Sequence, residues 1–326
     1  MRGERWKEQT VSNTVDKYIV NVSSVQDFMT CRYRWLSKWV LNRVPVEEGR
    51  PLRFGKLLHQ LFESYFIEQI PMEEVIQRYA DKWSIALSDA NNMKDRQDAA
   101  DALEDLAAYA EPLCLWKDHY PIENPPLEVE QPFLIQSPLH HDIFFRGRPD
   151  RMAILWGRLC HVQNRGLAAG VNFAMYAELA TRHLHEHVYA YAMSRKYPEI
   201  PYGGTVLNLL RKLKYRGVPT KKNPEGKILH GVDEIFWQGV VNISPEQNEK
   251  MMEEASLYAW EMRETERRYQ EEGRIPLPNE SMNDGYFHNV IDPYFRVLNG
   301  EIELDNPNYF KDREETYQPG EEVLIT

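Results

Sequence analysis

The sequence predicts a single α/β domain, in which a central mixed sheet is flanked by helices and a helical region is inserted on the N-terminal side. Three observations lead to this fold. Apolar residues recur at helical spacing through most of residues 20–125. Residues 126–212 contain short runs rich in β-branched and aromatic residues, bounded by glycine and proline. Residues 213–326 contain a basic loop, one more strand, a long helical pattern and an acidic tail.

Composition narrows the class of protein. A chain of 326 residues with 42% hydrophobic content can bury a large core. The N-terminus is charged and no apolar run reaches the roughly 20 residues that a membrane span requires, so we expect a cytoplasmic protein without membrane contacts. Three cysteines far apart indicate reduced thiols. A net charge of −11 argues against a surface that coats nucleic acid, so any nucleic-acid site must be local.

Four amphipathic helices are expected in the N-terminal part, at residues 24–41, 53–69, 72–87 and 95–113. The first follows Ser23 and Ser24, either of which can cap it. The second carries His59 and Glu63 four residues apart, on one face. A histidine on an apolar helix is usually a satisfied core residue, so His59 becomes a candidate ligand only together with other groups.

The main feature of the sheet region is a polar β-hairpin over residues 142–166. Trp156 and Gly157 lie between two β-rich runs and suit a two-residue turn with positive φ. This turn places Asp150 opposite Gln163, and directly opposed residues point to the same face, roughly 5 Å apart. One face then collects polar side chains, namely Arg146, Arg148, Asp150, His161, Gln163 and Arg165.

Glu130, near the start of an expected strand over residues 127–136, has two interpretations. It can form an ion pair with Arg146 or Arg148 at the strand edge, which is slightly favoured, or it can be a further acid of the polar site. Because Arg148 and Arg165 would repel each other if directly opposed, an acid or a bound phosphate should lie between them. Glu130 is the candidate acid.

Beyond the hairpin we expect a helix over residues 172–196, strands over 203–215 and 234–244, and a helix that begins at Pro245 and ends near Gly273. His183 and His187 are spaced to chelate a metal, but no HExxH pattern is present and a partly exposed helix face is the preferred interpretation. A cationic loop follows the first of these strands. Its basic residues are most often only solvated, and otherwise form a local DNA-binding strip: Lys212, Lys214, Arg216, Lys221 and Lys222.

Four segments, in this order, resemble the PD-(D/E)XK nuclease superfamily. They are VSSVQDFMTCRYRWL, FGKLLHQLFE with His59, GRPDRM with Asp150, and YAYAM around Tyr189 and Tyr191. The likeness covers about residues 20–212 and is nearest to the RecB-like branch, which includes phage exonucleases and CRISPR-associated RecB-like exonucleases. The resemblance implies a restriction-endonuclease-like core and metal-dependent cleavage of DNA.

The resemblance also implies a metal site. Family members bind Mg²⁺ or Mn²⁺ through carboxylates, a backbone carbonyl and, in this branch, a helix histidine. These roles fall on Asp150, Gln163, the carbonyl of Asn164, and His59, and the family lysine falls at Arg165. Here the sequence departs from the pattern, because QNR stands in place of D/E-x-K. Gln163 is neutral, and Arg165 stays protonated, so it can hold a phosphate but cannot activate water.

Substrate-binding positions follow from the resemblance as well. His185 stands where the family often has a glutamine four residues before its tyrosine, which is Tyr189 here. Arg211 and Lys212 lie in a segment that resembles the strand and basic loop after the core in phage members, and Arg148 lies in the hairpin. The expected partner is DNA. A phage origin, and with it a location in the host cytoplasm, is implied by resemblance alone.

Two functions from different classes stay open. Many members of this branch carry an iron-sulfur cluster held by one N-terminal and three C-terminal cysteines. Cys31 matches the first, but residues 275–298 contain no cysteine, so we expect no cluster. One function is an exonuclease-like, metal-dependent deoxyribonuclease whose activity is weak or lost, because Gln163 and Arg165 replace the acid and the lysine. The other is an inactive pseudo-nuclease that binds DNA or a protein partner.

Overall fold

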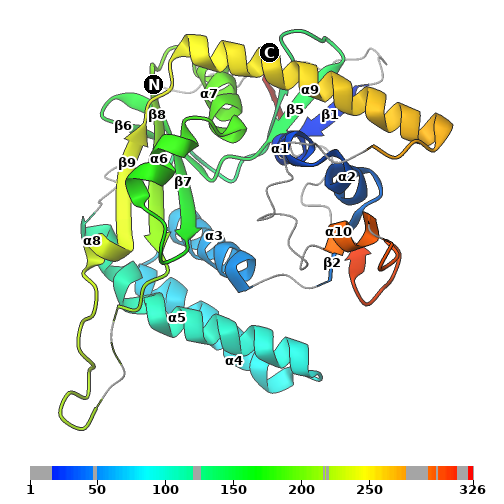
Figure 1. Ribbon diagram of the computed structural model, residues 1–326. Coiled ribbons are helices and arrows are strands. Elements are labelled where there is room, and N and C mark those ends of the chain that lie inside the picture. Colours follow the sequence, from blue (N-terminus) through cyan, green and yellow to red (C-terminus); the bar gives the residue numbers. More distant parts are fainter. Residues whose placement is uncertain are drawn as a thin grey trace.

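A computed structural model describes residues 17–46, 50–119, 126–215, 217, 220–276, 293–298, 300–313 and 322–325. Its centre is a mixed five-stranded sheet (Figure 1). The strand order is β3 (Glu128–Val129), β6 (Arg151–Leu155), β7 (Arg158–Leu167), β8 (Tyr202–Arg211) and β9 (Phe236–Val241). Strands β7 and β8 run parallel, and the other neighbours are antiparallel. The predicted α/β class with a mixed sheet is confirmed.

A second, four-stranded sheet has the order β1 (Tyr18–Asn21), β5 (Ile143–Gly147), β4 (Phe133–Gln136) and β11 (Val323–Ile325). The largest apolar core joins this sheet to three helices, α1 (Val22–Thr30), α7 (Leu184–Lys196) and α9 (Pro245–Glu272). A short antiparallel pair, β2 (Arg43–Pro45) with β10 (Phe310–Asp312), ties C-terminal residues to the N-terminal part. It is accompanied by α10 (Pro293–Leu298).

The expected helical region is present. Helix α3 (Arg50–Glu68) packs against β7, while α4 (Met72–Asp89) and α5 (Met93–His119) form a pair that projects away from the sheet (Figure 1). Their apolar faces form a second core with Leu210 and Phe236 of the central sheet. No helix within the described residues has the length and apolar character needed to span a membrane.

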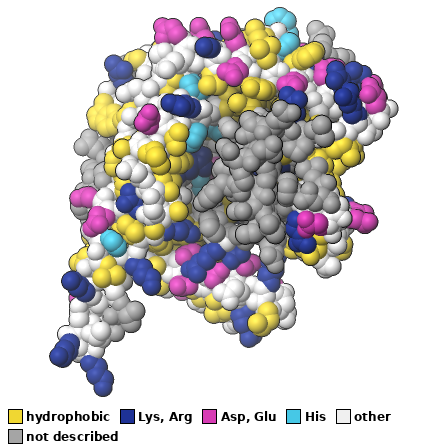
Figure 2. Space-filling model, in the orientation of Figure 1, with side chains coloured by type: hydrophobic (Ala, Val, Ile, Leu, Met, Phe, Trp, Pro, Cys, Tyr) yellow, Lys and Arg dark blue, Asp and Glu magenta, His cyan; other side chains and the backbone are white. Residues whose placement is uncertain are grey.

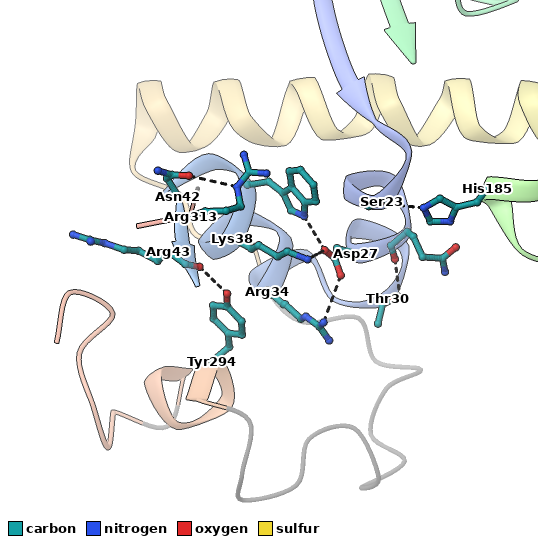
Figure 3. Close-up of polar contacts among 12 residues, drawn as sticks. Ser23, Asp27, Thr30, Arg34, Lys38, Asn42, Arg43, His185, Tyr294 and Arg313 are labelled. Carbon is teal, nitrogen blue, oxygen red and sulfur yellow. Dashed lines mark hydrogen bonds and ion pairs between the residues drawn. The ribbon is translucent and has the colours of Figure 1, made fainter. Parts of the chain in front are cut away.

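The expected first helix is broken into α1, α2 (Arg32–Trp35) and a π-helical turn, Leu36–Val40. Cys31 has extended backbone at the break, and the cap position is Asn21 instead of a serine. Figure 3 shows how Asp27 bridges this break: its Oδ2 accepts hydrogen bonds from Lys38 Nζ and Trp39 Nε1, each at 2.7 Å. Backbone hydrogen bonds also cross the break, from the Cys31 N–H to the Asp27 carbonyl at 2.8 Å and from the Trp35 N–H to the Cys31 carbonyl at 2.9 Å.

The central hairpin has the predicted turn but a shorter extent. Trp156 and Gly157 have φ of 52° and 71°, and Leu155 pairs with Arg158, as expected. However, β5 pairs in the four-stranded sheet, where Arg146 lies opposite Leu134. The prediction that Arg146 and Arg148 share the hairpin face, with Arg148 opposed to Arg165, is wrong. The chain between β5 and β6 crosses from one sheet to the other.

Three other expected elements are divided. The strand over residues 127–136 becomes β3 and β4, because Glu130 turns the chain with a φ of 49° and Pro132 follows without a backbone donor. The helix over 172–196 becomes α6 (Phe173–Ala180) and α7. The strand expected over residues 234–244 is divided as well, because its first two residues belong to the short helix α8 (Val232–Ile235), which precedes β9. Helix α9 begins at Pro245 and ends at Gly273, which has a φ of 66°, as predicted.

Candidate functional site

Three ionisable side chains from separate elements meet where α3 packs on the central sheet. His59 comes from α3, Glu130 follows β3, and Asp150 directly precedes β6. One ligand atom of each lies within 4.8 Å of those of the other two. His59 Nδ1 is 3.5 Å from Asp150 Oδ2 and 3.9 Å from Glu130 Oε1. We call these three residues the acidic cluster.

Backbone pairing holds the two acids side by side. Val129 pairs with Arg151, and the Glu130 N–H donates to the carbonyl of Asp150 at 3.2 Å. The Asp150 carboxylate accepts a further hydrogen bond, at 2.9 Å, from the backbone N–H of Asn164 in β7. The position of the carboxylates is therefore determined by three strands, and the hairpin alone would not produce it.

The acidic cluster places two carboxyl groups close together in a shielded position. The side chains of Glu130 and Asp150 are only 15% and 14% exposed. Burial raises the pKa of Glu130 to about 8, and the charges of Asp150 and Glu63 act in the same direction, against that of Arg148. Arg148 Nε donates to Glu130 Oε2 at 2.9 Å. A bound dication would favour the charged form of Glu130 and release its proton.

This donor set fits a divalent metal ion. Mg²⁺ is usually held by one or two carboxylates together with waters and substrate phosphates, and carboxylates also suit Mn²⁺. The acidic cluster offers two carboxylates and one imidazole within reach of a single ion. Glu130 pairs with Arg148, as the first interpretation of the sequence expected, and it also lies among the candidate ligands, as the second requires.

Gln163 and Arg165 lie on the face of β7 that α7 covers, together with His161. Gln163 is 2% exposed. Burial acts to lower the pKa of Arg165, but nearby acids, first among them Asp150, raise it on balance, so the guanidinium stays charged. The Asn164 side chain points to the opposite face, where its Oδ1 accepts from Asn208 Nδ2 at 3.0 Å. Metal ligation by Gln163 or by the Asn164 carbonyl stays a prediction.

The other predicted substrate residues have contacts of their own. His185 Nε2 lies 3.1 Å from Ser23 Oγ (Figure 3), and burial lowers the pKa of His185 to about 4. The Tyr189 hydroxyl donates to the carbonyl of Arg148 at 3.2 Å, so it braces the segment before Asp150. Arg211 lies over the ring of Phe173, and Lys212 over that of Phe54. Their contact with substrate stays a prediction.

Sequence reasoning missed a buried ion pair between His161 of β7 and Glu186 of α7. His161 Nδ1 lies 3.3 Å from Glu186 Oε2, with side chains 0% and 1% exposed. Burial raises the pKa of Glu186, but the hydrogen bond and charge of His161, and a hydrogen bond from Thr205, outweigh it and lower the pKa to about 2. The sequence does contain a signal for the burial of Glu186, because this acid is followed directly by the almost apolar run HVYAYAM.

His187 is not on an exposed helix face: it is 2% exposed, and its ring nitrogens contact Asn248 Oδ1 at 3.1 Å and the Thr181 carbonyl at 2.8 Å. Cys31 is buried and packs against an aromatic cluster that includes Tyr294 and Phe310. Residues 277–292, in the segment compared with the iron-sulfur region, lie outside the described residues.

Comparison with protein families relates most of the chain to a known superfamily. The family model of the PD-(D/E)XK nuclease superfamily matches residues 19–212, more than half of the chain. The matched range extends from β1 through β8 and contains all three residues of the acidic cluster. No curated protein matches the chain.

Proposed function

The chain belongs to the PD-(D/E)XK nuclease superfamily, and from that premise we propose that it is a RecB-like, exonuclease-type protein that binds DNA and hydrolyses it slowly with a divalent metal ion. One observation carries this proposal: the acidic cluster combines two shielded carboxylates with an imidazole. Gln163 removes one acid from the family pattern, but Glu130 supplies a second carboxylate beside Asp150. The capacity to bind a metal ion is therefore retained.

The residues of the site would have different roles in binding and cleavage. His59, Glu130 and Asp150 would hold Mg²⁺ or Mn²⁺, which when bound polarises the phosphodiester and lowers the pKa of water. Arg165, close enough to Asp150 to be influenced by its charge, is suited to bind a phosphate oxygen. It cannot accept a proton from water at neutral pH, because a guanidinium has a pKa above about 12. Cleavage therefore lacks the family lysine, and we expect it to be slow.

The alternative is an inactive pseudo-nuclease that binds DNA or a protein partner. Its support is that both β7 positions of the motif have lost their usual chemistry, in Gln163 and Arg165. A phosphate-binding arginine beside a metal site is adequate for gripping a nucleic-acid backbone. It is poorly suited to activating water.

A cleavage assay separates the two functions. Single- and double-stranded DNA are incubated with the protein and Mg²⁺ or Mn²⁺, and wild type is compared with Asp150→Asn. This variant removes one charge but keeps an oxygen that can accept from the Asn164 N–H. The control is Asp142→Asn, at a carboxylate that pairs with Arg263 away from the cluster. Cleavage lost only in Asp150→Asn supports the nuclease; no cleavage by wild type supports the pseudo-nuclease.

Restoring the family motif tests whether Gln163 and Arg165 of β7 occupy the motif positions. Gln163→Glu combined with Arg165→Lys should increase the metal-dependent rate by roughly 10²-fold or more, the scale of a positioned acid or base. Because Gln163 is buried, Arg165→Lys alone is measured in parallel, with urea unfolding of each variant. If folded variants cleave no faster than wild type, Gln163 and Arg165 do not occupy the motif positions.

A further inference from the structure

The described residues between β8 and α8 form a two-stranded arm. The Gly217 N–H donates to the Lys227 carbonyl and the Leu229 N–H to the Tyr215 carbonyl, each at 2.8 Å. Thr220 and Asn223 pair at the tip. Figure 1 shows this arm projecting well beyond the central sheet and the neighbouring α5. Its hydrogen bonds give it a defined shape, although few residues pack around it.

The arm concentrates exposed lysines that lack acidic partners. We call Lys214, Lys221, Lys222 and Lys227 the arm lysines; all are exposed, and no ion pair joins any of them to an acid of the described residues. Figure 2 shows Lys and Arg side chains at the projecting tip. Elsewhere many cations are paired, as Lys196 is with Glu128. On a chain of net charge −11, this is a local positive surface.

The arm starts at the end of the sheet that holds the acidic cluster. Strand β8 runs parallel to β7, with Asn208 beside Asn164 and Arg211 beside Leu167. The Lys212 N–H continues this pairing with a 2.8 Å bond to the carbonyl of Leu167. Asn164 is the residue whose N–H holds Asp150. The parallel register therefore directs the chain into the arm at the same sheet edge where the acids lie.

We propose that the arm binds the sugar-phosphate backbone of duplex DNA that flanks the nucleotides at the acidic cluster. This inference rests on the proposed function and assigns it a substrate form. A two-stranded ribbon has the dimensions that the major groove admits, and lysines that contact phosphates position a duplex without reading its sequence. Ile228 and Leu229, 49% and 48% exposed, add an apolar edge at the base of the arm.

The arm chemistry favours a duplex over a single strand. Proteins that bind single strands combine a cationic groove with exposed aromatic rings on which successive bases stack. Among the described residues of the arm, the aromatic ring is Tyr215, which is only 7% exposed. The arm therefore offers charge for phosphates but no stacking platform. A contact with the backbone of paired DNA uses the arm lysines and requires no stacking surface.

The test neutralises the distal arm lysines with Lys221→Gln, Lys222→Gln and Lys227→Gln in one full-length protein. The matched control carries the same charge change elsewhere, with Lys82→Gln, Lys250→Gln and Lys311→Gln at exposed positions. Affinity for a short blunt duplex is measured by fluorescence anisotropy over a series of salt concentrations, without metal so that no cleavage occurs. A single strand of the same length is measured in parallel.

We expect the arm variant to bind the duplex at least tenfold more weakly than the control variant at low salt. The slope of log affinity against log salt should fall by about 0.9 for each lysine that contacts a phosphate. Binding of the single strand should change equally in the two variants. Equal duplex affinity of arm and control variants, or a larger loss for the single strand, overturns the inference.

Failure of this inference can be told apart from failure of the proposed function. The arm variant should bind Mn²⁺ as wild type does, because none of its three substitutions touches the acidic cluster. If DNA cleavage by wild type depends on Asp150 but duplex affinity does not depend on the arm lysines, only the proposed role of the arm is wrong. If wild type neither binds nor cleaves DNA, the proposed function is wrong and the arm inference with it.

Discussion

Two histidine–carboxylate contacts on the central sheet have opposite characters. In the acidic cluster His59 is 32% exposed, and burial together with Asp150 raises the pKa of Glu130 to about 8. In the pair of His161 with Glu186 both side chains are buried, and the pKa of the acid is lowered to about 2 despite its burial. The Nδ1–oxygen distances, 3.5 and 3.3 Å, are similar.

The difference lies in how the charges are balanced. One imidazole faces one carboxylate in the buried pair, and Thr205 adds a hydrogen bond, so the acid is satisfied within the protein. The acidic cluster places two carboxylates beside one imidazole, with Glu63 nearby, and the ion pair of Glu130 with Arg148 does not offset their effect, because the pKa of Glu130 stays raised to about 8. We infer that the buried pair serves the fold and the acidic cluster serves a ligand. The following predictions test this distinction.

The largest effect should come from breaking the buried pair. Glu186→Ala leaves His161 without its partner in the core, and removing one member of a buried pair costs roughly 3–5 kcal/mol. We expect the urea midpoint of unfolding to fall accordingly, while the folded fraction still binds Mn²⁺. An unfolding free energy equal to that of wild type would show that the pair contributes nothing to the fold.

Asp150→Asn should have the opposite effect to Glu186→Ala: it should weaken metal binding and leave the stability of the fold nearly unchanged. It keeps an oxygen to accept from the Asn164 N–H but removes a charge from the acidic cluster. We expect Mn²⁺ affinity, measured by calorimetry, to fall about 100-fold, which corresponds to roughly 2.7 kcal/mol. Without metal, the free energy of unfolding should be unchanged or slightly higher. A loss of stability as large as that of Glu186→Ala would contradict the distinction between the two regions.

The raised pKa of Glu130 predicts how metal affinity depends on pH. Below pH 8 the ion must displace a proton, so apparent Mn²⁺ affinity should rise by up to about tenfold per pH unit between pH 6 and 8 and level off above. Glu130→Gln should bind more weakly and lose most of this dependence. A wild-type affinity that is flat over this range would show that metal binding releases no proton from Glu130.

The same shift has a consequence for stability without metal. A folded pKa raised from 4.5 to about 8 favours the folded state fully below pH 4.5, and this contribution is lost as pH rises through 8. Glu130→Gln removes the effect. At pH 9 the variant should therefore be more stable than wild type by about 1–2 kcal/mol after allowance for solvent screening. Urea unfolding at pH 5 and pH 9 measures the difference.

The smallest effect is expected for Arg148→Ala. Its side chain is 42% exposed, so the ion pair with Glu130 should contribute less than about 1 kcal/mol to stability. Because this cation competes for Glu130, its removal should strengthen Mn²⁺ binding several-fold. Weaker binding of the ion would mean that Arg148 orients Glu130 more than it neutralises it.

Local rules account for much of the fold. The turn at Trp156 and Gly157, with the register that follows from it, depends on neighbouring residues and was predictable. The same holds for α9, whose limits at Pro245 and Gly273 follow from start and stop signals at its ends. Apolar spacing predicted the limits of α3 and α4 within a few residues, whereas α5 continues to His119, beyond the predicted end at residue 113.

The division of strands between two sheets could not be predicted in this way. Residues 127–136 and 142–155 each read as continuous β pattern, and the exchange from one sheet to the other depends on partners distant in sequence. Strand β5 lies beside β1, about 125 positions earlier, and β4 lies beside β11 near the C-terminus. Arg146 was therefore assigned to the wrong surface, because alternation along a strand gives a face only when the sheet is known.

By itself the sequence determined the α/β class, the tight turn of the hairpin and the presence of Asp150 and His59 in segments typical of one family, because each depends on short-range pattern. Only the tertiary structure decided that Glu130 joins them and that His161 lies against Glu186 in the core. The reason is physical: charge balance and burial depend on which side chains the packed strands and helices bring together. That arrangement raises the pKa of Glu130 and lowers that of Glu186.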